Sequence, residues 1–334
     1  MRISYLILFC LLLLGIVLNL AIGSVYVPVS SVISALVGAE SETIFAKIVW
    51  QIRMPKAAAA MLAGASLSLS GLLMQTFFRN PLAGPFVLGI SSGAGLGAAV
   101  WIMGSGWFMS MGLAGAFLNG WGLVATSSLG AAVVLVLLLT VSRRIADVST
   151  LLILGMMLGS AVSAIVMLLQ FFSGSEALQR FVIWGMGDLG GLGSEEILVL
   201  SVLNISVLTF AFFLAQPLNV LLLGEENAKS LGINVQKIRW YIIIATALLA
   251  GSITAFCGPI AFIGIAVPHA ARMLWRTQRH QILIPGTILL GMVVMLWCQT
   301  IATLPFQDKI IPINIITSLL GAPAVVWIAL SFRK

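Results

Sequence analysis

Charged residues are scarce in this sequence. They make up 8% of its 334 positions, whereas hydrophobic residues make up 60%. A soluble domain carries roughly a quarter charged residues, so this composition excludes a protein whose whole surface faces water. The apolar runs are about 20 residues long, which is the length that a helix needs to cross a bilayer. We therefore predict an all-α polytopic membrane protein with a single transmembrane domain over residues 1–334.

Residues that bind metals or carry out acid–base chemistry are also scarce. The three cysteines, Cys10, Cys257 and Cys298, stand in separate apolar runs, and we interpret them as packing residues. The two histidines, His269 and His280, form no cluster, so we expect no metal site. Acidic groups are nearly absent from the apolar runs, although a proton-coupled carrier needs them as a relay. An ion-coupled carrier or channel, and a membrane enzyme or assembly factor, are therefore kept only as alternatives.

No nucleotide-binding motif is present either. The dipeptide Gly-Lys, which P-loop ATPases require, does not occur. We expect no cofactor on this chain, and any ATP-driven step must use ATP and Mg bound by a separate chain. The run Gly93-Ala94-Gly95-Leu96-Gly97 evokes a dinucleotide loop, but no soluble βαβ unit surrounds it. Its small residues favour close helix packing, or the lining of a wide pathway.

Ten apolar runs, bounded by polar or Pro/Gly breaks, predict ten membrane spans. They fall near residues 3–25, 55–78, 86–104, 111–141, 149–172, 196–216, 238–257, 258–275, 282–304 and 312–331. The first is longer than the core of a signal peptide and no clear cleavage site follows it, so we interpret it as a retained span. The polar stretch 173–195 is predicted to hold a short re-entrant or surface helix around Leu178–Met186.

The charges between these spans indicate an orientation. With both termini in the cytoplasm, the inner segments hold 12 cations and three anions, and the outer segments hold five cations and seven anions. The inner cations are Arg2, Arg79, Arg143, Arg144, Lys229, Lys237, Arg239, Arg272, Arg276, Arg279, Arg333 and Lys334. This bias follows the positive-inside rule. The net charge of +7 therefore reports membrane orientation and predicts no nucleic-acid partner.

The largest inner insert covers about residues 217–239 and is amphipathic. Three leucines, Leu221 to Leu223, precede a helical pattern over Glu225–Leu231 that ends at Gly232. We interpret this insert as an interaction helix. The alternative is a passive surface loop.

Four segments together resemble a known family. They are residues 52–56 with 79–83, then 224–233, 258–269 and 320–323. The residues, order and spacing of these segments resemble those of the permease subunits of ATP-binding-cassette (ABC) importers for iron-siderophores, haem and cobalamin. The resemblance implies a homodimer of ten-span subunits with an inverted repeat, in the bacterial inner membrane. It also implies two ATPase subunits on the cytoplasmic side and a periplasmic or lipid-anchored binding protein outside.

The resemblance implies roles for three groups of residues. The ATPase-coupling group is Gly224, Glu225, Glu226, Ala228, Lys229, Ser230, Leu231 and Gly232. The cytoplasmic-gate group is Asn80, Pro81, Leu82, Val148 and Ser149. The docking group for the binding protein is Arg53, Lys56 and Lys309. For the first two docking cations, the alternative is a helix-end anchor at the lipid headgroups.

The sequence departs from the family pattern near its C-terminal end. Gln299 and Thr303 replace the usual Asp and Arg of the ninth span, and Lys309 is the cation near the missing arginine. Ile310 and Asn314 replace a usual Glu and Gly. The motifs do not choose among a ferric siderophore, haem, cobalamin and a small oxyanion. A pathway of small and apolar residues favours a large, preassembled chelate over a naked ion.

Overall fold

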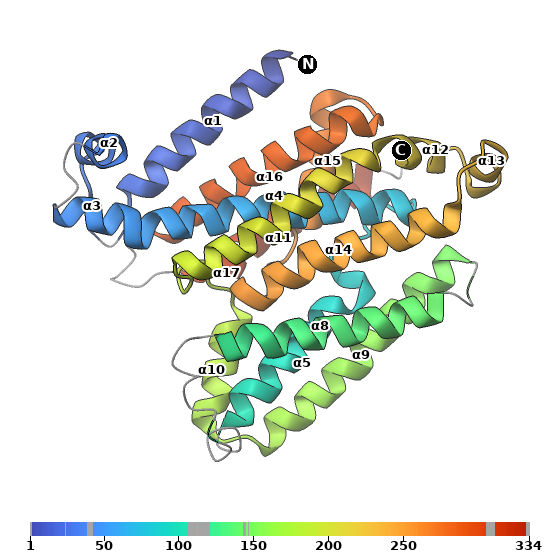
Figure 1. Cartoon of the computed structure of the whole chain (residues 1–334), viewed down its shortest axis with the longest axis horizontal. Coiled ribbons are helices and arrows are strands. Elements are labelled where there is room, and N and C mark those ends of the chain that lie inside the picture. Colours follow the sequence, from blue (N-terminus) through green and yellow to red (C-terminus); the bar gives the residue numbers. More distant parts are fainter. Residues whose placement is uncertain are drawn as a thin grey trace.

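A computed structural model describes residues 2–23, 25–38, 43–105, 112, 121–142, 145, 147–304 and 311–331. Over these residues the regular structure is helical, without strands (Figure 1). The helices, in chain order, are α1 (Arg2–Ala21), α2 (Val29–Val37), α3 (Ile44–Ile48), the π-helix η1 (Val49–Arg53), α4 (Met54–Phe77), the 3₁₀-helix η2 (Pro85–Leu88), α5 (Ile90–Met103), α8 (Trp121–Ser142), α9 (Val148–Phe172), α10 (Ser175–Gly185), α11 (Ser194–Phe213), α12 (Ala215–Leu221), α13 (Glu225–Ser230), α14 (Val235–Cys257), α15 (Ile263–Trp275), α16 (His280–Ala302) and α17 (Ile313–Ser331).

Each predicted span contains a helix, so the predicted fold class is confirmed. Among the described residues, seven helical segments are long and apolar enough to cross a membrane: α1, the continuous α3–η1–α4 segment, α8, α9, α11, α14 and α16. The shorter helices α5, α15 and α17 occupy the other three predicted positions. The surface helix expected around Leu178–Met186 is α10. The inverted repeat remains a prediction.

The eighth predicted span, 258–275, begins too early. Residues 258–262 are not helical, and α15 has only 13 residues. Gly258 has a φ of +76° and packs so closely on α10 that a Cβ atom would lie 2.5 Å from the carbonyl oxygen of Trp184. At about 1.5 Å per residue, α15 alone is too short for a hydrocarbon core of about 30 Å.

Helix α4 forms the centre of the bundle and contacts α16, α14, α15 and α11. In its most apolar window 83% of residues are buried. Glycines allow this close packing: a Cβ atom on Gly71 would lie 1.7 Å from the carbonyl oxygen of Gly264 in α15, and one on Gly64 would lie 2.2 Å from that of Gly291 in α16. The small residues that the sequence concentrates in α4 therefore serve backbone-to-backbone contact, as is common between membrane helices.

A buried polar cluster joins α4 to two neighbouring helices. The hydroxyl of Ser66 in α4 donates to Asn204 Oδ1 in α11 at 2.8 Å. Asn204 Nδ2 donates in turn to the hydroxyl of Ser252 in α14 at 3.1 Å. Hydrogen bonds of this kind between membrane helices contribute about 0.6–2 kcal/mol each. They fix the register of α11 and α14 against α4.

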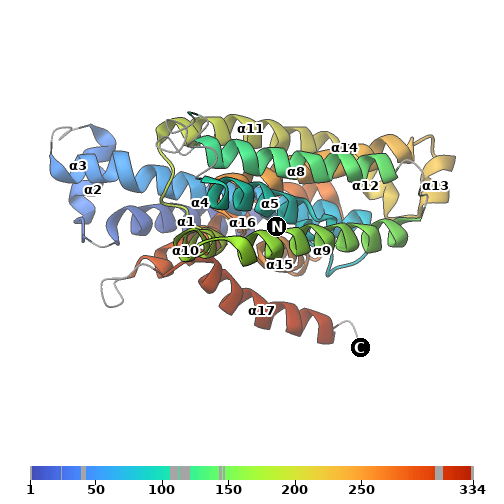
Figure 2. The same cartoon turned by 90° about the horizontal axis from the view of Figure 1, so that it is seen from below.

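The two ends of the bundle carry different elements (Figures 1 and 2). We use "the α13 end" for the end that carries α12, α13, residues 78–84, residues 145 and 147, and the α15–α16 loop. We use "the α2 end" for the opposite end, which carries α2, α3 and α10. Helix α9 runs between the two ends at the edge of the bundle, and only 17% of its most apolar window is buried. Its apolar side chains therefore face lipid or another chain.

Candidate coupling and gate site

The insert that sequence analysis assigned to coupling folds as an arm. We use "the arm" for residues 215–234, which comprise α12, α13 and the residues that link them to α14. Gly224, with a φ of +112°, precedes α13, and Gly232, with a φ of +79°, follows it. The N–H groups of Ile233 and Gly232 donate to the carbonyls of Ala228 and Lys229 at 3.0 and 2.9 Å, which is a Schellman cap. This cap requires a left-handed backbone conformation at position 232, which glycine adopts without steric cost.

The arm has a buried face and an apolar exposed face. Ala228 is fully buried against the bundle, whereas Leu223 and Leu231 expose 61% and 63% of their surface. Lys229 donates to Glu226 at 2.8 Å on the exposed side. This hydrogen bond lowers the pKa of Glu226 and raises that of Lys229. Exposed leucines beside a charged pair form a surface that suits a protein partner better than water.

Helix α12 is fastened to the start of α16. Asn219 Oδ1 accepts from the His280 backbone N–H at 2.8 Å and lies 2.9 Å from His280 Nδ1. Asn219 Nδ2 donates to Gln281 Oε1 at 2.8 Å. On the other side of the ring, His280 Nε2 lies 2.8 Å from the hydroxyl of Thr76, near the end of α4. His280 is thus a structural link between α4, α12 and α16, a role that its isolation in the sequence did not reveal.

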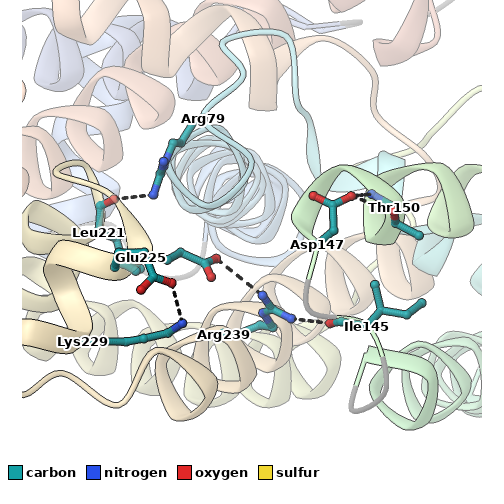
Figure 3. Close-up of polar contacts among 9 residues, drawn as sticks. Arg79, Ile145, Asp147, Thr150, Leu221, Glu225, Lys229 and Arg239 are labelled. Carbon is teal, nitrogen blue, oxygen red and sulfur yellow. Dashed lines mark hydrogen bonds and ion pairs between the residues drawn. The ribbon is translucent and has the colours of Figure 1, made fainter.

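The first predicted gate loop, Asn80 to Leu82, follows α4 at the same end as the arm. Asn80 Oδ1 accepts from the Leu82 N–H at 2.9 Å, and the Asn80 carbonyl accepts from the Ala83 N–H at 3.1 Å. Arg79, with a φ of +47°, turns the chain into this loop and donates from Nη2 to the Leu221 carbonyl at 3.1 Å (Figure 3). The loop is therefore a stiff turn that is tied to the end of α12.

The second predicted gate segment, Val148 and Ser149, forms the first turn of α9. Asp147 caps this helix: its Oδ2 accepts from the Thr150 N–H at 2.7 Å and from the Thr150 hydroxyl at 2.6 Å (Figure 3). These hydrogen bonds lower the pKa of Asp147 below its ordinary value. Ser149 is exposed. Both predicted gate segments thus lie at the α13 end, and their role as a gate stays a prediction.

Arg239 connects the arm to the second gate segment. It lies in the second turn of α14 and exposes only 2% of its surface. Its Nη1 donates to the Ile145 carbonyl at 2.7 Å, and its Nη2 lies 3.5 Å from Glu225 Oε1 of α13 (Figure 3). Sequence analysis counted Arg239 only as one of the cytoplasmic cations. A single charge near the start of an apolar helix does not reveal, from the sequence, which residues it contacts in the fold.

The predicted docking cations lie at the α2 end in different environments. Arg53 exposes only 7% of its surface, and its guanidinium donates to the backbone carbonyls of Leu20, at 2.6 Å, and Val25. Its side chain is thus committed to the α1–α2 connection, and this geometry favours a structural role over direct docking. Lys56 is partly buried beside the acidic residue Asp188 and the glycine Gly190. Lys309 lies outside the described residues.

The described residues hold no group of three or more His, Cys, Asp or Glu side chains that suits a metal ion. Besides a small hollow lined by Glu225, Lys229 and Arg239, two larger hollows adjoin the predicted site. One of about 1050 Å³ lies between α12 and the α15–α16 loop, and its lining includes Leu222, Leu223, Arg276 and Arg279. The other, of about 450 Å³, lies between η2 and α9, and its lining includes Gly155, Gly159, Ser160 and Ser163.

Comparison with known proteins decides the family. The model of the FecCD transport family matches residues 11–331. The chain belongs to the FecCD transport family. It is 38% identical over 288 residues to the vitamin B12 import system permease proteins BtuC of Salmonella typhi and Salmonella newport (strain SL254), which covers 86% of this chain and 84% of each relative. The family and these relatives make it a multi-pass permease of the metal-chelate and vitamin B12 type of ABC importer.

Solved structures agree with this family. An inward-facing structure, assigned to a metal-chelate type ABC transporter, superposes over the whole of both chains with a TM-score of 0.85 at 30% identity. PsaBC from Streptococcus pneumoniae, in complex with a Fab, superposes with a TM-score of 0.56 at 13% identity over 88% of this chain and 94% of that chain. The second likeness shows the fold alone. The first extends the family match to the arrangement of the whole bundle.

Proposed function

We propose that two copies of this chain form the membrane pathway of an ABC importer for a preassembled metal chelate: a ferric siderophore, haem or cobalamin. A separate binding protein delivers the chelate, and two separate ATPase subunits supply the energy. The importer-permease class rests on the family. The homodimer, the partners and the chelate are the proposal.

The arm is the observation that carries this proposal. It exposes two leucines, Leu223 and Leu231, on either side of the short helix α13, which has a glycine turn at each end. A rigid element of this kind transmits motion from a partner, because its apolar contacts and its end geometry are defined. Among the described residues, this α13 end carries seven cations: Arg79, Lys229, Lys237, Arg239, Arg272, Arg276 and Arg279. By the positive-inside rule, this end is the cytoplasmic one. An ATPase would therefore bind the arm from the cytoplasmic side.

Helix α9 fits the proposed pathway between two copies. It is the least buried of the long apolar helices, and its hollow beside η2 is lined by two glycines and three serines together with the apolar residues Phe86, Val87, Met156 and Met167. Small, weakly polar linings suit a large chelate, which keeps its own metal ligands. A naked cation needs dense oxygen or nitrogen ligands instead.

The set of buried ionisable side chains does not favour an ion-coupled carrier. Among the described residues, no Asp or Glu side chain is buried, whereas intramembrane carboxylates usually form the relay of such carriers. The buried basic side chains in the described part of the chain are Arg53 and Arg239, which contact backbone carbonyls, and the imidazole of His280 at the start of α16. None of these three lies in a chain of acidic groups.

Reconstitution tests the proposal. The permease is placed in liposomes with its candidate ATPase and binding protein, and uptake of radiolabelled cobalamin, haem and ferric siderophores is measured with and without ATP. We expect uptake of one chelate class that requires ATP, the ATPase and the binding protein together. Uptake that needs an ion gradient and no ATPase would contradict the proposal. The chelate that the purified binding protein retains identifies the substrate.

A further inference from the structure

The side chain of Arg239 meets three separate elements at the α13 end. It contacts Glu225 of α13 at 3.5 Å and the Ile145 carbonyl, ahead of α9, at 2.7 Å. Its guanidinium carbon also lies 5.8 Å from the ring centre of Phe77, the last residue of α4. Phe77 stands two residues before Arg79, which opens the first gate loop. One side chain thus lies between Glu225 of the arm and Ile145, ahead of the Asp147 cap of α9 (Figure 3).

Two polar links of Arg239, to Ile145 and to Glu225, differ in strength. A charged donor at 2.7 Å from a carbonyl makes a strong hydrogen bond, and a buried guanidinium without that partner would be costly. The contact with Glu225 is longer, and the Glu225 side chain is 29% exposed, so water competes for it. The link to the segment before α9 is therefore firm, whereas the link to α13 is easily exchanged.

The adjacent residue Glu226 forms an ion pair of a different kind. Glu226 also pairs with a cation, Lys229, but both belong to α13 and their side chains are 89% and 57% exposed. That pair connects α13 to nothing outside itself. Of the two adjacent glutamates in α13, only Glu225 has an ion pair with another element among the described residues.

We propose that Arg239 is the positioning residue that transmits a displacement of α13 to the segment before α9. The inference rests on the proposed function, in which the ATPase moves α13 and Val148–Ser149 belong to the gate. When α13 moves with its partner, Glu225 draws the guanidinium of Arg239 with it. Its firm bond to Ile145 then displaces Ile145, which lies two positions before the Asp147 cap. The start of α9 moves with that cap.

The test uses the full complex of permease, ATPase and binding protein in nanodiscs. Every permease carries Ser149→Cys, and the readout is the yield of the cross-link between the two copies with and without ATP. Arg239→Gln removes both polar links, and Arg239→Lys keeps the charge but cannot contact two partners in the same planar geometry. Lys237→Gln is the matched control, because it removes a cation from the same helix at an exposed position.

We expect the nucleotide-dependent change in cross-linking to fall at least about fivefold in Arg239→Gln, to fall partly in Arg239→Lys, and to persist in Lys237→Gln. An unchanged response in Arg239→Gln overturns the inference. If that variant does not yield a monodisperse protein, Glu225→Gln removes the charge of the link to α13 alone and should likewise lower the response at least about fivefold. A full response there overturns the inference equally.

The failure of the proposed function would look different. In that case the parent Ser149→Cys permease would not co-purify with the ATPase, and this would overturn both proposals before any Arg239 variant is made. A parent complex that assembles and responds to ATP, with an Arg239→Gln variant that responds equally, would overturn only the role of Arg239.

Discussion

Two buried arginines stand at opposite ends of the bundle and make different contacts. Arg53, at the α2 end, donates to the backbone carbonyls of Leu20 and Val25, so it holds the α1–α2 connection against the start of α4. Arg239, at the α13 end, contacts α13 and the segment before α9, which are separate elements. The first arginine, Arg53, stabilises a connection between helices that the proposed transport cycle does not move. The second connects parts that the proposed transport cycle moves, so burial alone does not tell a scaffold residue from a coupling residue.

The largest expected effect concerns Arg53 and the α1–α2 connection. Arg53→Ala removes two hydrogen bonds from a charged donor, each worth about 1.5–3 kcal/mol, so we expect the free energy of unfolding to fall by about 3 kcal/mol. Chemical denaturation in detergent micelles measures this. Lys56→Ala is the control and should change the free energy of unfolding by less than about 0.5 kcal/mol. Equal stability of Arg53→Ala and the parent would return Arg53 to the docking hypothesis.

The second prediction concerns the arm at the α13 end. Gly232→Pro cannot adopt the φ of +79° and loses the N–H that donates to the Lys229 carbonyl, so the end of α13 must rearrange. We expect ATP-dependent uptake to fall more than about tenfold, the scale of a coupling energy above about 1.4 kcal/mol. Leu231→Asp, which places a charge on the exposed face of the arm, should act in the same direction.

The control for this prediction comes from the α2 end. Gly174 precedes α10 with a negative φ of −73°, and a Cβ atom added there would have no neighbour within 4 Å. Gly174→Ala should therefore leave uptake within about twofold of the parent, the range of an ordinary surface substitution. If Gly232→Pro transports as well as Gly174→Ala, the arm is not the coupling element.

The third prediction separates Lys56 from Arg53. If Lys56 receives an acidic residue of the binding protein, Lys56→Glu slows association, because a rim charge sets the encounter rate and contributes about 0.5–2 kcal/mol. Surface plasmon resonance should show a defect that shrinks as salt rises, since salt screens the repulsion. An association rate equal to that of the parent at low salt would support the headgroup-anchor interpretation.

The smallest expected effect concerns the cap of α9. The pKa of Asp147 is lowered by its hydrogen bonds to Thr150, so the cap stabilises the helix fully above the ordinary carboxyl pKa, about 3.9, and is lost as pH falls through the lowered value. Asp147→Ala should speed amide exchange a few-fold in the first turn of α9 at neutral pH, whereas Asp147→Asn should change it less. Equal exchange in the parent and Asp147→Ala would show that the cap does not hold this turn.

Much of the fold was predictable from residue patterns. Apolar runs located the membrane helices, and a polar, Gly-rich stretch located α10. The alternation of glycines with a charged helical pattern located α13. These features depend on local sequence, which is why they could be read without the structure.

The features that the sequence did not predict have a different physical origin. The late start of α15 follows from the packing of Gly258 on Trp184, and the burial of Arg53 follows from the turn after α1. The links made by Arg239 and His280 join segments that are far apart along the chain. Each of these depends on long-range contact, and no residue pattern within a single segment encodes it.

The most direct test of the link between the arm and the gate is one cross-linking measurement. Permease with Ser149→Cys is assembled with its ATPase and binding protein, and the cross-link between the two copies is measured with and without ATP. The same measurement is made with Gly232→Pro added. We expect a nucleotide-dependent cross-link that becomes independent of nucleotide when Gly232→Pro disrupts the arm. A response to ATP that is equally large with and without Gly232→Pro would contradict coupling through α13.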